Sequence, residues 1–329
     1  MSGTLNRRTL LHAATAAALA SRSRPARAQT VTPVFSYPMG LPGRPLGDGF
    51  YIRRGFTCEG STYFPGWWHT GENWHLTEGE TAGVGVYAVA DGEVVFTDSD
   101  YPGRVVIVRH QGDLCSMYGH LAYDPPVAAG DVVERGQEIG TVLQRTDGRA
   151  SHLHFEMRTF FEQPEVNGAA PRYGYACGVD CPPGPGYWPI ADPQLPVAMG
   201  WRNPMHALAR RAYPDGGPAA GAEVVVAMSP ASPTTVVWSS VTGQNRERVA
   251  EIDLHPGDSY PVLAIHAWAE NTPHTSAEAY HVWYQIALRD GRQGWVLAMM
   301  PASEETGIDG RPSTIILNFL LNVVTPGDG

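Results

Sequence analysis

Short apolar runs separated by turn dipeptides dominate the chain from about residue 51 to residue 161. Asp91-Gly92 falls between two of these runs and is typical of a two-residue hairpin turn. The runs cover residues 84–90, 93–96, 104–109, 114–118, 132–133 and 139–143. Strands at this spacing favour an antiparallel sheet over a βαβ array, so the pattern predicts an all-β fold class.

A second series of runs begins near residue 221 and contains another tight hairpin turn, Asp290-Gly291. The intervening segment is rich in proline, glycine and tyrosine and shows no sustained period. The later runs cover residues 223–228, 234–239, 260–268, 281–288 and 295–299, with an apolar tail at 313–324 that suits a strand or a helix. We therefore predict an extended arm at 29–50, a β domain at 51–165, a loop and linker at 166–220 with a short helical turn at 206–211, and a second β domain at 221–329.

The first 28 residues are typical of an export signal peptide rather than of a folded element. Arg7-Arg8 precedes an apolar run at 10–20, and Ala26-Arg27-Ala28 is a small-x-small cleavage site. The run is too short to span a bilayer as a permanent helix. The arginine pair resembles a twin-arginine signal, which we favour over an ordinary secretory signal. We expect an exported protein that works in the periplasm or outside the cell.

Composition narrows the chemistry that the chain can perform. All 23 basic residues are arginine, so reactions that need a lysine, such as Schiff-base chemistry or lipoyl attachment, are excluded. Removal of residues 1–28 leaves 18 arginines against 33 acidic residues, a formal charge of −15. Nucleic acid and anionic lipid repel a chain of this charge, and no further apolar stretch reaches spanning length. We expect neither a nucleic-acid partner nor an integral membrane protein.

Four cysteines allow up to two disulfides in an oxidising compartment, with three possible pairings. A bridge between Cys177 and Cys181 would close a small loop and leave Cys58 to pair with Cys115. A zinc knuckle is disfavoured because only one close cysteine pair exists and three residues separate its members.

The string SHLHFEM at 151–157 carries the strongest chemical signal. Side chains alternate along a strand, so His152, His154 and Glu156 share one face while three apolar side chains share the other, which can be buried. The two imidazoles lie about 6.6 Å apart along such a strand, at a rise of about 3.3 Å per residue. One histidine can then bind a metal while the other reaches a metal-bound water. Two surface histidines on a half-buried strand give the same pattern.

A second string, WHTGENWH at 68–75, places an oxygen donor four residues after His69, in the side-chain amide of Asn73. This spacing allows both side chains to chelate one ion from a single loop or turn. An amide is neutral and binds zinc less strongly than an aspartate does. Glu72 and His75 are alternative donors, and a polar loop beside a stacked tryptophan is the non-functional interpretation.

A third string, MYGHL at 117–121, places His120 at the end of a strand. In order, HTGEN, VYAVADGEVV, VVIVRHQGDLCSMYGHL, VAAGDVVERGQEIGTV and SHLHFEMR resemble the lysostaphin-type zinc metalloendopeptidases. The pattern of that family is HxxxD, a Y-x-HL histidine, a glycine-containing ribbon and a terminal HLHFE. The resemblance covers about residues 65–160 and four of five site positions, and the departure is Asn73, where the family has aspartate.

This resemblance implies a lysostaphin-type antiparallel β-sheet peptidase domain with a groove along the sheet. It implies that His69, Asn73 and His154 hold Zn2+, and that His120 and His152 are the catalytic pair. The pair would orient and deprotonate water, or donate to the tetrahedral intermediate and the leaving amine. The implied substrate is the peptide part of bacterial peptidoglycan, which agrees with export because the cell wall lies outside the membrane. The chain is then predicted to be an exported zinc metalloendopeptidase.

Residues 222–302 are similar to bacterial SH3-like domains. HVWYQI at 281–286 and DGRQGWV at 290–296 match the last hairpin of that small barrel. The similarity implies a small SH3-like β-barrel domain that helps to bind the wall or a partner. Trp295 is equally consistent with simple core packing.

Other interpretations compete with an active peptidase. Asn73 favours a catalytically impaired peptidase-fold protein that binds cell wall or regulates another hydrolase, whereas the four remaining site histidines favour activity. A lipoyl-type carrier domain has a hairpin like the one predicted for residues 130–140. Such a domain is modified on a lysine, and this chain contains no lysine. The sequence contains neither a G-x-S-x-G nor an HExxH string, so serine hydrolases of that type and HExxH metalloproteases are not supported.

Overall fold

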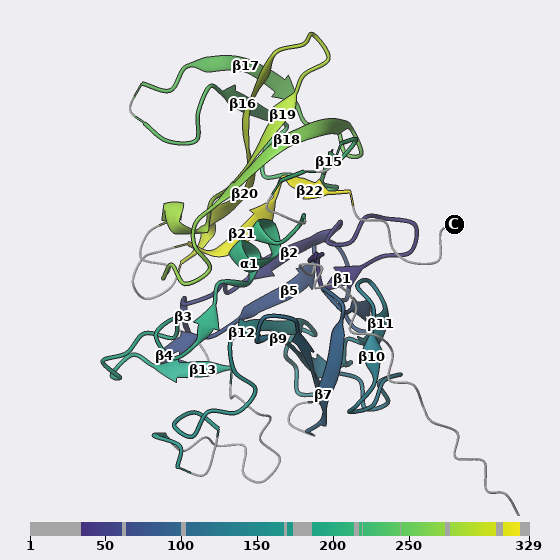
Figure 1. The fold of residues 1–329 in the computed structure, drawn as a ribbon, viewed down its shortest axis with the longest axis vertical. Coiled ribbons are helices and arrows are strands. Elements are labelled where there is room, and N and C mark those ends of the chain that lie inside the picture. Colours follow the sequence, from purple (N-terminus) through teal and green to yellow (C-terminus); the bar gives the residue numbers. More distant parts are fainter. Residues whose placement is uncertain are drawn as a thin grey trace, which may run out of the picture. The chain divides into compact units, whose positions relative to one another are not determined.

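The apolar runs of the sequence form antiparallel strands along nearly the whole described chain (Figure 1). The computed structural model describes residues 34–60, 64–99, 103–167, 170–173, 186–213, 217–218, 220–243, 245–273, 277–306 and 312–322. All of them fall within one compact unit, Thr32–Gly329. The predicted export signal at 1–28 and two of the cysteines, Cys177 and Cys181, lie outside the described residues.

Twelve named strands precede residue 160. They are β1 (Met39–Gly40), β2 (Phe50–Arg53), β3 (Glu59–Gly60), β4 (Phe64–His69), β5 (Glu72–Leu76), β6 (Gly85–Tyr87), β7 (Gly92–Asp98), β8 (Arg104–His110), β9 (Leu114–Leu121), β10 (Val132–Val133), β11 (Glu138–Thr141) and β12 (Leu153–Arg158).

The later elements are again almost all strands. They are β13 (Tyr187–Pro189), β14 (Trp201–Arg202), α1 (Pro204–Arg210), β15 (Glu223–Val226), β16 (Thr234–Trp238), β17 (Arg248–Asp253), β18 (Ser259–Ala267), the 3-10 helix η3 (Ala277–Tyr280), β19 (Val282–Ala287), β20 (Gln293–Thr306), β21 (Pro312–Leu317) and β22 (Phe319–Leu321). The prediction of an all-β fold is confirmed. No helix among the described residues is long and apolar enough to cross a membrane.

One long sheet passes through both predicted β regions in the order β10-β7-β8-β9-β12-β5-β2-β21-β20-β19-β18-β15-β22. The two regions meet where β2 pairs with β21, with Ile52 opposite Ile315 and Arg53 opposite Thr314. Two further sheets, with the strand orders β1-β6-β11 and β13-β4-β3, are separate from it. The division into domains at residues 165 and 221, and the SH3-like character of the second, remain predictions.

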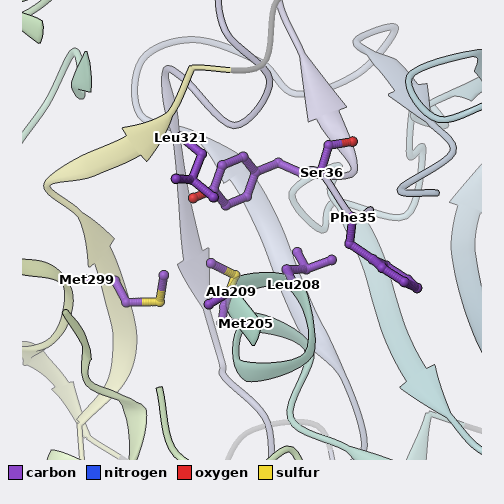
Figure 2. A pocket seen from close by; sticks show the side chains of 8 residues that line it. Phe35, Ser36, Met205, Leu208, Ala209, Met299 and Leu321 are labelled. Atoms are coloured by element: carbon purple, nitrogen blue, oxygen red, sulfur yellow. The ribbon is translucent and has the colours of Figure 1, made fainter. Parts of the chain in front are cut away.

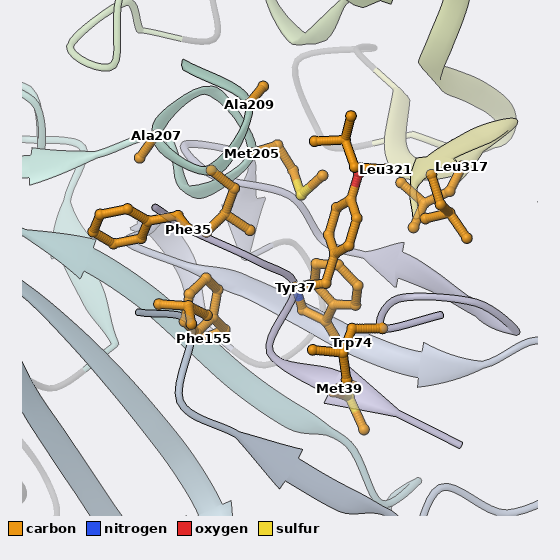
Figure 3. Packing of buried hydrophobic residues seen from close by; sticks show 14 of the residues in the cluster. Phe35, Tyr37, Met39, Trp74, Phe155, Met205, Ala207, Ala209, Leu317 and Leu321 are labelled. Atoms are coloured by element: carbon orange, nitrogen blue, oxygen red, sulfur yellow. The ribbon is translucent and has the colours of Figure 1, made fainter. Parts of the chain in front are cut away.

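The core forms on one face of β12 and its neighbours. Leu153, Phe155 and Met157 are fully buried, as the alternation of the string at 151–157 predicts, and Trp74 of β5 packs in the same cluster (Figure 3). The cluster continues without a break into β21 and β22, where Leu317 and Leu321 are also buried. One continuous apolar cluster therefore supports both predicted β regions.

The predicted extended arm contributes to this core. Phe35, Tyr37 and Met39 are at most 3% exposed, and the Tyr37 hydroxyl lies 3.1 Å from that of Tyr284. A small apolar hollow lies between this segment, α1 and the last strands, lined by Phe35, Ser36, Tyr37, Met205, Leu208, Ala209, Met299 and Leu321 (Figure 2).

The predicted helical turn at 206–211 is part of α1. Pro204 occupies the first turn, where its missing N–H costs no hydrogen bond. The Asn203 side chain caps the helix by accepting a hydrogen bond from the His206 backbone N–H at 3.3 Å. The predicted linker is therefore not a plain loop: it also holds β13 and β14, and β14 pairs with β12.

The disulfide suggested between Cys58 and Cys115 is not formed, because Cys115 is a buried thiol. Cys115 lies on β9 opposite Arg158 of β12 and Arg109 of β8, and Cys58 follows β2, in the loop that pairs with His69. Burial raises the pKa of the Cys115 thiol. Of the three pairings that the sequence left open, the one between Cys58 and Cys115 is therefore excluded.

Candidate metal centre

Three side chains from neighbouring strands converge at one end of β12. His69 ends β4, Asn73 lies on β5, and His154 lies on β12 directly opposite Asn73. The turn between β4 and β5 passes so close to β12 that a Cβ on Gly71 would lie 2.4 Å from the Phe155 carbonyl oxygen. Only glycine permits this approach, which brings His69 against the sheet.

The donor atoms of these three side chains meet at short distances. His69 Nε2 lies 3.1 Å from His154 Nδ1, and Asn73 Oδ1 lies 3.2 Å from the same nitrogen. The side chains are buried, with residue exposures of 0%, 5% and 6% for His69, Asn73 and His154. We call these three residues the donor set.

Glu156 fixes the tautomer of His154. His154 Nε2 lies 3.1 Å from Glu156 Oε1, and the same carboxylate accepts hydrogen bonds from Thr70 Oγ1 at 2.6 Å and from Trp201 Nε1 at 3.0 Å. Burial alone would raise the pKa of Glu156, but the hydrogen bond from His154 and the charge of Arg158 lower it to about 2. An ionised carboxylate only accepts, so Nε2 carries the proton and Nδ1 keeps its lone pair.

His69 is oriented in the same sense. Its Nδ1 lies 3.4 Å from the Gly55 carbonyl oxygen, which can only accept, so Nε2 keeps the lone pair. Burial, together with the nearby His154, lowers the pKa of His69 to about 3, and the ring is neutral at pH 7. Three atoms with available lone pairs therefore lie together, since His154 Nδ1 is close to both His69 Nε2 and Asn73 Oδ1.

This arrangement fits a zinc ion. Two nitrogen ligands at about 2.0–2.1 Å from a tetrahedral zinc lie about 3.3 Å apart, close to the 3.1 Å between the two imidazoles. The third donor is the neutral amide of Asn73. Within the described part of the chain, no three His, Cys, Asp or Glu side chains gather to hold a metal. The donor set brings three donor atoms together and lacks the negative charge that an aspartate would add.

The two alternative donors predicted beside Asn73 point elsewhere. Glu72 accepts hydrogen bonds from Tyr280 Oη at 3.0 Å and Trp74 Nε1 at 3.2 Å, and burial raises its pKa to about 8. The His75 ring stacks on His152 with centroids 5.0 Å apart.

The predicted catalytic pair lies next to the donor set. The rings of His120 and His152 meet edge to face with centroids 4.8 Å apart, and the His120 centroid lies 6.0 Å from that of His154. Both residues are half-buried. His120 has a φ of +64°, which a non-glycine residue adopts only under constraint from its surroundings. The structure thus brings all five predicted site residues together.

The polar face of β12 is largely covered. Glu156 and Arg158, which share this face with His154, are fully buried. The cause is the segment after β12, because Trp201 of β14 donates to Glu156 and Phe160 packs against Arg158. On this face His152 alone is partly exposed among residues 152–158.

Several residues of the site escaped the sequence analysis. Glu156 was placed on the correct face but given no role, although its position two residues after His154 was the available signal. Gly186 accepts a hydrogen bond from the Thr70 N–H at 3.0 Å, and the Tyr187 ring lies 5.4 Å from that of His69. These two belong to a segment without periodicity, which gave no signal.

The region that contains the donor set matches a known protein family. Residues 68–168 match the model of Peptidase family M23, and the chain carries a Peptidase M23 domain. The expected family resemblance is confirmed for this region.

Two curated relatives share this region. The chain is 33% identical over 78 residues to the cell division protein DipM of Caulobacter vibrioides, which is 23% of this chain and 13% of DipM. It is 38% identical over 78 residues to the peptidoglycan DD-endopeptidase ShyA of Vibrio cholerae, which is 23% of this chain and 17% of ShyA. The chain thus spans less than a fifth of the length of either relative.

Two solved structures that align with the chain are lysostaphin and a zinc-containing peptidase. Lysostaphin in solution aligns over 84% of this chain and 96% of its own, with 14% identity and a TM-score of 0.33. A zinc-containing peptidase from Vibrio cholerae aligns over 38% of this chain and 36% of its own, with 27% identity and a TM-score of 0.29.

Proposed function

We propose that the chain is an exported, zinc-dependent metalloendopeptidase that hydrolyses peptide bonds of bacterial peptidoglycan. The observation that carries this proposal is the convergence of His69 Nε2, Asn73 Oδ1 and His154 Nδ1 beside the pair His120 and His152, inside an M23 domain. The name of its relative ShyA, a peptidoglycan DD-endopeptidase, supports the substrate class. The arginine pair and cleavage site in residues 1–28 support export.

The donor set would hold the zinc, and a bound zinc supplies a water of lowered pKa and a polarised scissile carbonyl. His152 is placed to move the proton. Its Nδ1 lies 2.9 Å from the Ala150 carbonyl, so Nδ1 carries the hydrogen and Nε2 the lone pair. Nε2 would accept a proton from the attacking water and return it to the amine nitrogen as the C–N bond breaks.

The surroundings of His152 keep it in the basic form. Burial and the neighbouring His120 and His75 lower the pKa of His152 well below its ordinary value, so the ring is neutral at pH 7. His120 meets His152 edge to face and would orient the water or donate to the developing oxyanion.

Asn73 favours a second candidate function. A donor set without a negative charge suits a protein that keeps the peptidase fold, binds cell wall or regulates another hydrolase, and retains zinc poorly. Zinc content and the digestion of purified wall, followed by mass spectrometry of the released peptides, separate the two functions. New peptide termini from the wild type and none from His152→Ala support the enzyme. Wall binding without digestion supports the second candidate.

Replacement of Asn73 by aspartate tests the donor assignment directly. We expect Asn73→Asp to bind zinc at least about tenfold more tightly, or about 1.4 kcal/mol, because a carboxylate adds a negative charge beside the cation. Zinc affinity is measured by competition with a chelator. Equal affinity in the two proteins would show that residue 73 is not a zinc ligand.

A further inference from the structure

A single loop, residues 54–58, contacts His69 and Asn73 of the donor set through its backbone. The Arg54 carbonyl accepts the Asn73 backbone N–H at 3.4 Å, the Gly55 carbonyl faces His69 Nδ1, and the Thr57 N–H donates to the His69 carbonyl at 2.7 Å. Two residues of the loop, Arg54 and Thr57, have φ values of +63° and +56°. Such conformations persist only where the surroundings impose them.

The surroundings that impose them come from the far end of the sequence. The Gly55 N–H donates to the Ser313 carbonyl of β21 at 3.0 Å. The Phe56 N–H donates to the hydroxyl of Tyr280, on η3. A Cβ on Gly55 would lie 2.6 Å from Ile315 Cδ1 and 2.9 Å from the Tyr280 hydroxyl oxygen. The loop is therefore pressed against the last third of the chain at a distance that only glycine allows.

Tyr280 also reaches the strand of the donor set. Its hydroxyl donates to Glu72 Oε1 at 3.0 Å, and Glu72 immediately precedes Asn73 on β5. One buried hydroxyl thus accepts from the loop behind His69 and donates to the residue beside Asn73. Tyr280 is fully buried, so neither partner finds water if the hydroxyl is removed.

Tyr280 belongs to the apolar core that joins the two β regions. The segment at 35–39, α1 and the last strands share one apolar core, in which Phe35 and Tyr37 lie with Met205, Leu317 and Leu321 (Figure 3). Met299 of β20 and Leu321 line one hollow together with Phe35 and Met205 (Figure 2). Through β2 and β21 the main sheet is continuous across the same junction. The C-terminal β region is therefore built into the support of the donor set.

We propose that Tyr280 is a positioning residue for the donor set, and that the C-terminal β region thereby completes the metal site. The proposal rests on the proposed function insofar as the donor set binds zinc. Without the hydroxyl, the Phe56 N–H and the Glu72 carboxyl each lose a partner in a buried place. The loop at 54–58 then relaxes, and His69 and Asn73 lose their mutual spacing.

The test compares two buried tyrosines in the full-length chain. Tyr280→Phe removes the hydroxyl at the donor set, and Tyr284→Phe removes one that contacts Tyr37 in the same core. We expect zinc affinity, measured by chelator competition, to fall about 10–100-fold in Tyr280→Phe, the range for lost supporting contacts around a metal site. Tyr284→Phe should stay within about twofold of wild type. The visible spectrum of the Co2+-loaded protein should change in the first variant only.

A second pair of variants tests the same contact from the loop at 54–58. Gly55→Ala pushes the loop off Tyr280 and Ile315, whereas Gly294→Ala creates similar crowding against Val237 and the Trp238 carbonyl, on β16. We expect only the first to weaken zinc binding, and this pair decides the matter if Tyr280→Phe fails to fold. Equal zinc affinity in each variant and its control overturns the proposal.

Zinc binding and turnover report on different claims. If the wild type binds zinc more tightly than His154→Ala does but digests no wall, the proposed enzyme fails, and the zinc affinities of the two pairs still decide the role of Tyr280. If the wild type binds zinc no better than His154→Ala, the donor set is not a zinc site and the proposed role of Tyr280 is refuted.

Discussion

The donor set and the neighbouring pair of histidines differ mainly in burial. His69 and His154 are almost fully buried, and the ring nitrogen that points away from the donors faces an acceptor in each, the Gly55 carbonyl or Glu156. His120 and His152 are half-buried and their rings meet edge to face, while His152 Nδ1 also faces an acceptor, the Ala150 carbonyl. Groups that must keep a fixed spacing lie inside the fold, whereas groups that must reach a substrate remain partly open.

The largest effects are expected when one histidine of the donor set and one histidine of the neighbouring pair are replaced by alanine. His154→Ala should abolish zinc retention and wall digestion together. His152→Ala should keep zinc and lose activity by about 10²–10⁴-fold, the usual contribution of a positioned acid or base. Zinc content by mass spectrometry and digestion of purified wall give the two readouts. Loss of zinc in His152→Ala would show that the pair is part of the donor set.

A histidine remote from both groups extends the comparison to pH. His110 lies between the Asp91 carbonyl at 2.9 Å and Ser116 Oγ at 2.7 Å, and burial lowers its pKa from 6.5 to about 4. The unfolded chain binds the proton more readily, so the stability from this group is complete above pH 6.5 and declines as the pH falls toward 4.

His110 alone should lower the free energy of unfolding by about 2 kcal/mol between pH 7 and pH 5. Urea unfolding of wild type and His110→Gln at both pH values measures this contribution as the difference between their pH dependences. Identical pH dependence in the two proteins would contradict the assignment.

The lock on His154 can be weakened without touching a donor. Glu156→Gln replaces the carboxylate that accepts from Nε2 and removes the negative charge behind the ring. We expect zinc affinity to fall about 10–100-fold with the fold retained. Glu270→Gln, which disrupts an ion pair with Arg211, is the control and should bind zinc as wild type does. An unchanged affinity in Glu156→Gln would show that Glu156 serves stability alone.

The smallest effect concerns the ring that supports His152. His75 stacks between Tyr51 and His152 with centroids 5.7 Å and 5.0 Å away. His75→Ala should lower kcat about threefold to tenfold because ring pairs contribute about 0.5–1.5 kcal/mol, whereas His75→Phe keeps the stack and the rate. A loss of activity in His75→Phe equal to that in His75→Ala would indicate a role for the imidazole nitrogens instead.

Periodicity predicted only part of the site. The alternation around Leu153 and Phe155 placed His154 on its strand, and the apolar runs anticipated β8 and β9. β4 and β5, which carry His69 and Asn73, were expected to be a loop or turn, because their polar residues and glycine obscure the apolar pattern. Periodicity also missed β17 (Arg248–Asp253), whose side chains are mostly exposed or half-buried and leave little apolar signal.

The family resemblance implied the donors, but nothing in the sequence indicated their support. The hydrogen bond between His69 and Gly55 joins residues that are 14 positions apart in the chain. The hydrogen bond between Tyr280 and Glu72 joins residues that are 208 positions apart. No single stretch of sequence contains such a pair, and glycine and tyrosine carry no donor motif. The burial of Glu156 depends likewise on Trp201, 45 residues away. What the sequence could not supply was contact between distant segments.

The pairing of Ile52 with Ile315 has a consequence for how the protein is made. Long-range strand pairs form slowly because the chain must lose entropy in closing a long loop before the strand contacts can stabilise the fold. Synthesis proceeds from the N-terminus, so β2 and the loop at 54–58 are made about 260 residues before their partner β21. We expect the nascent chain to lack its native sheet, and to be unable to retain metal, until β21 has been synthesised.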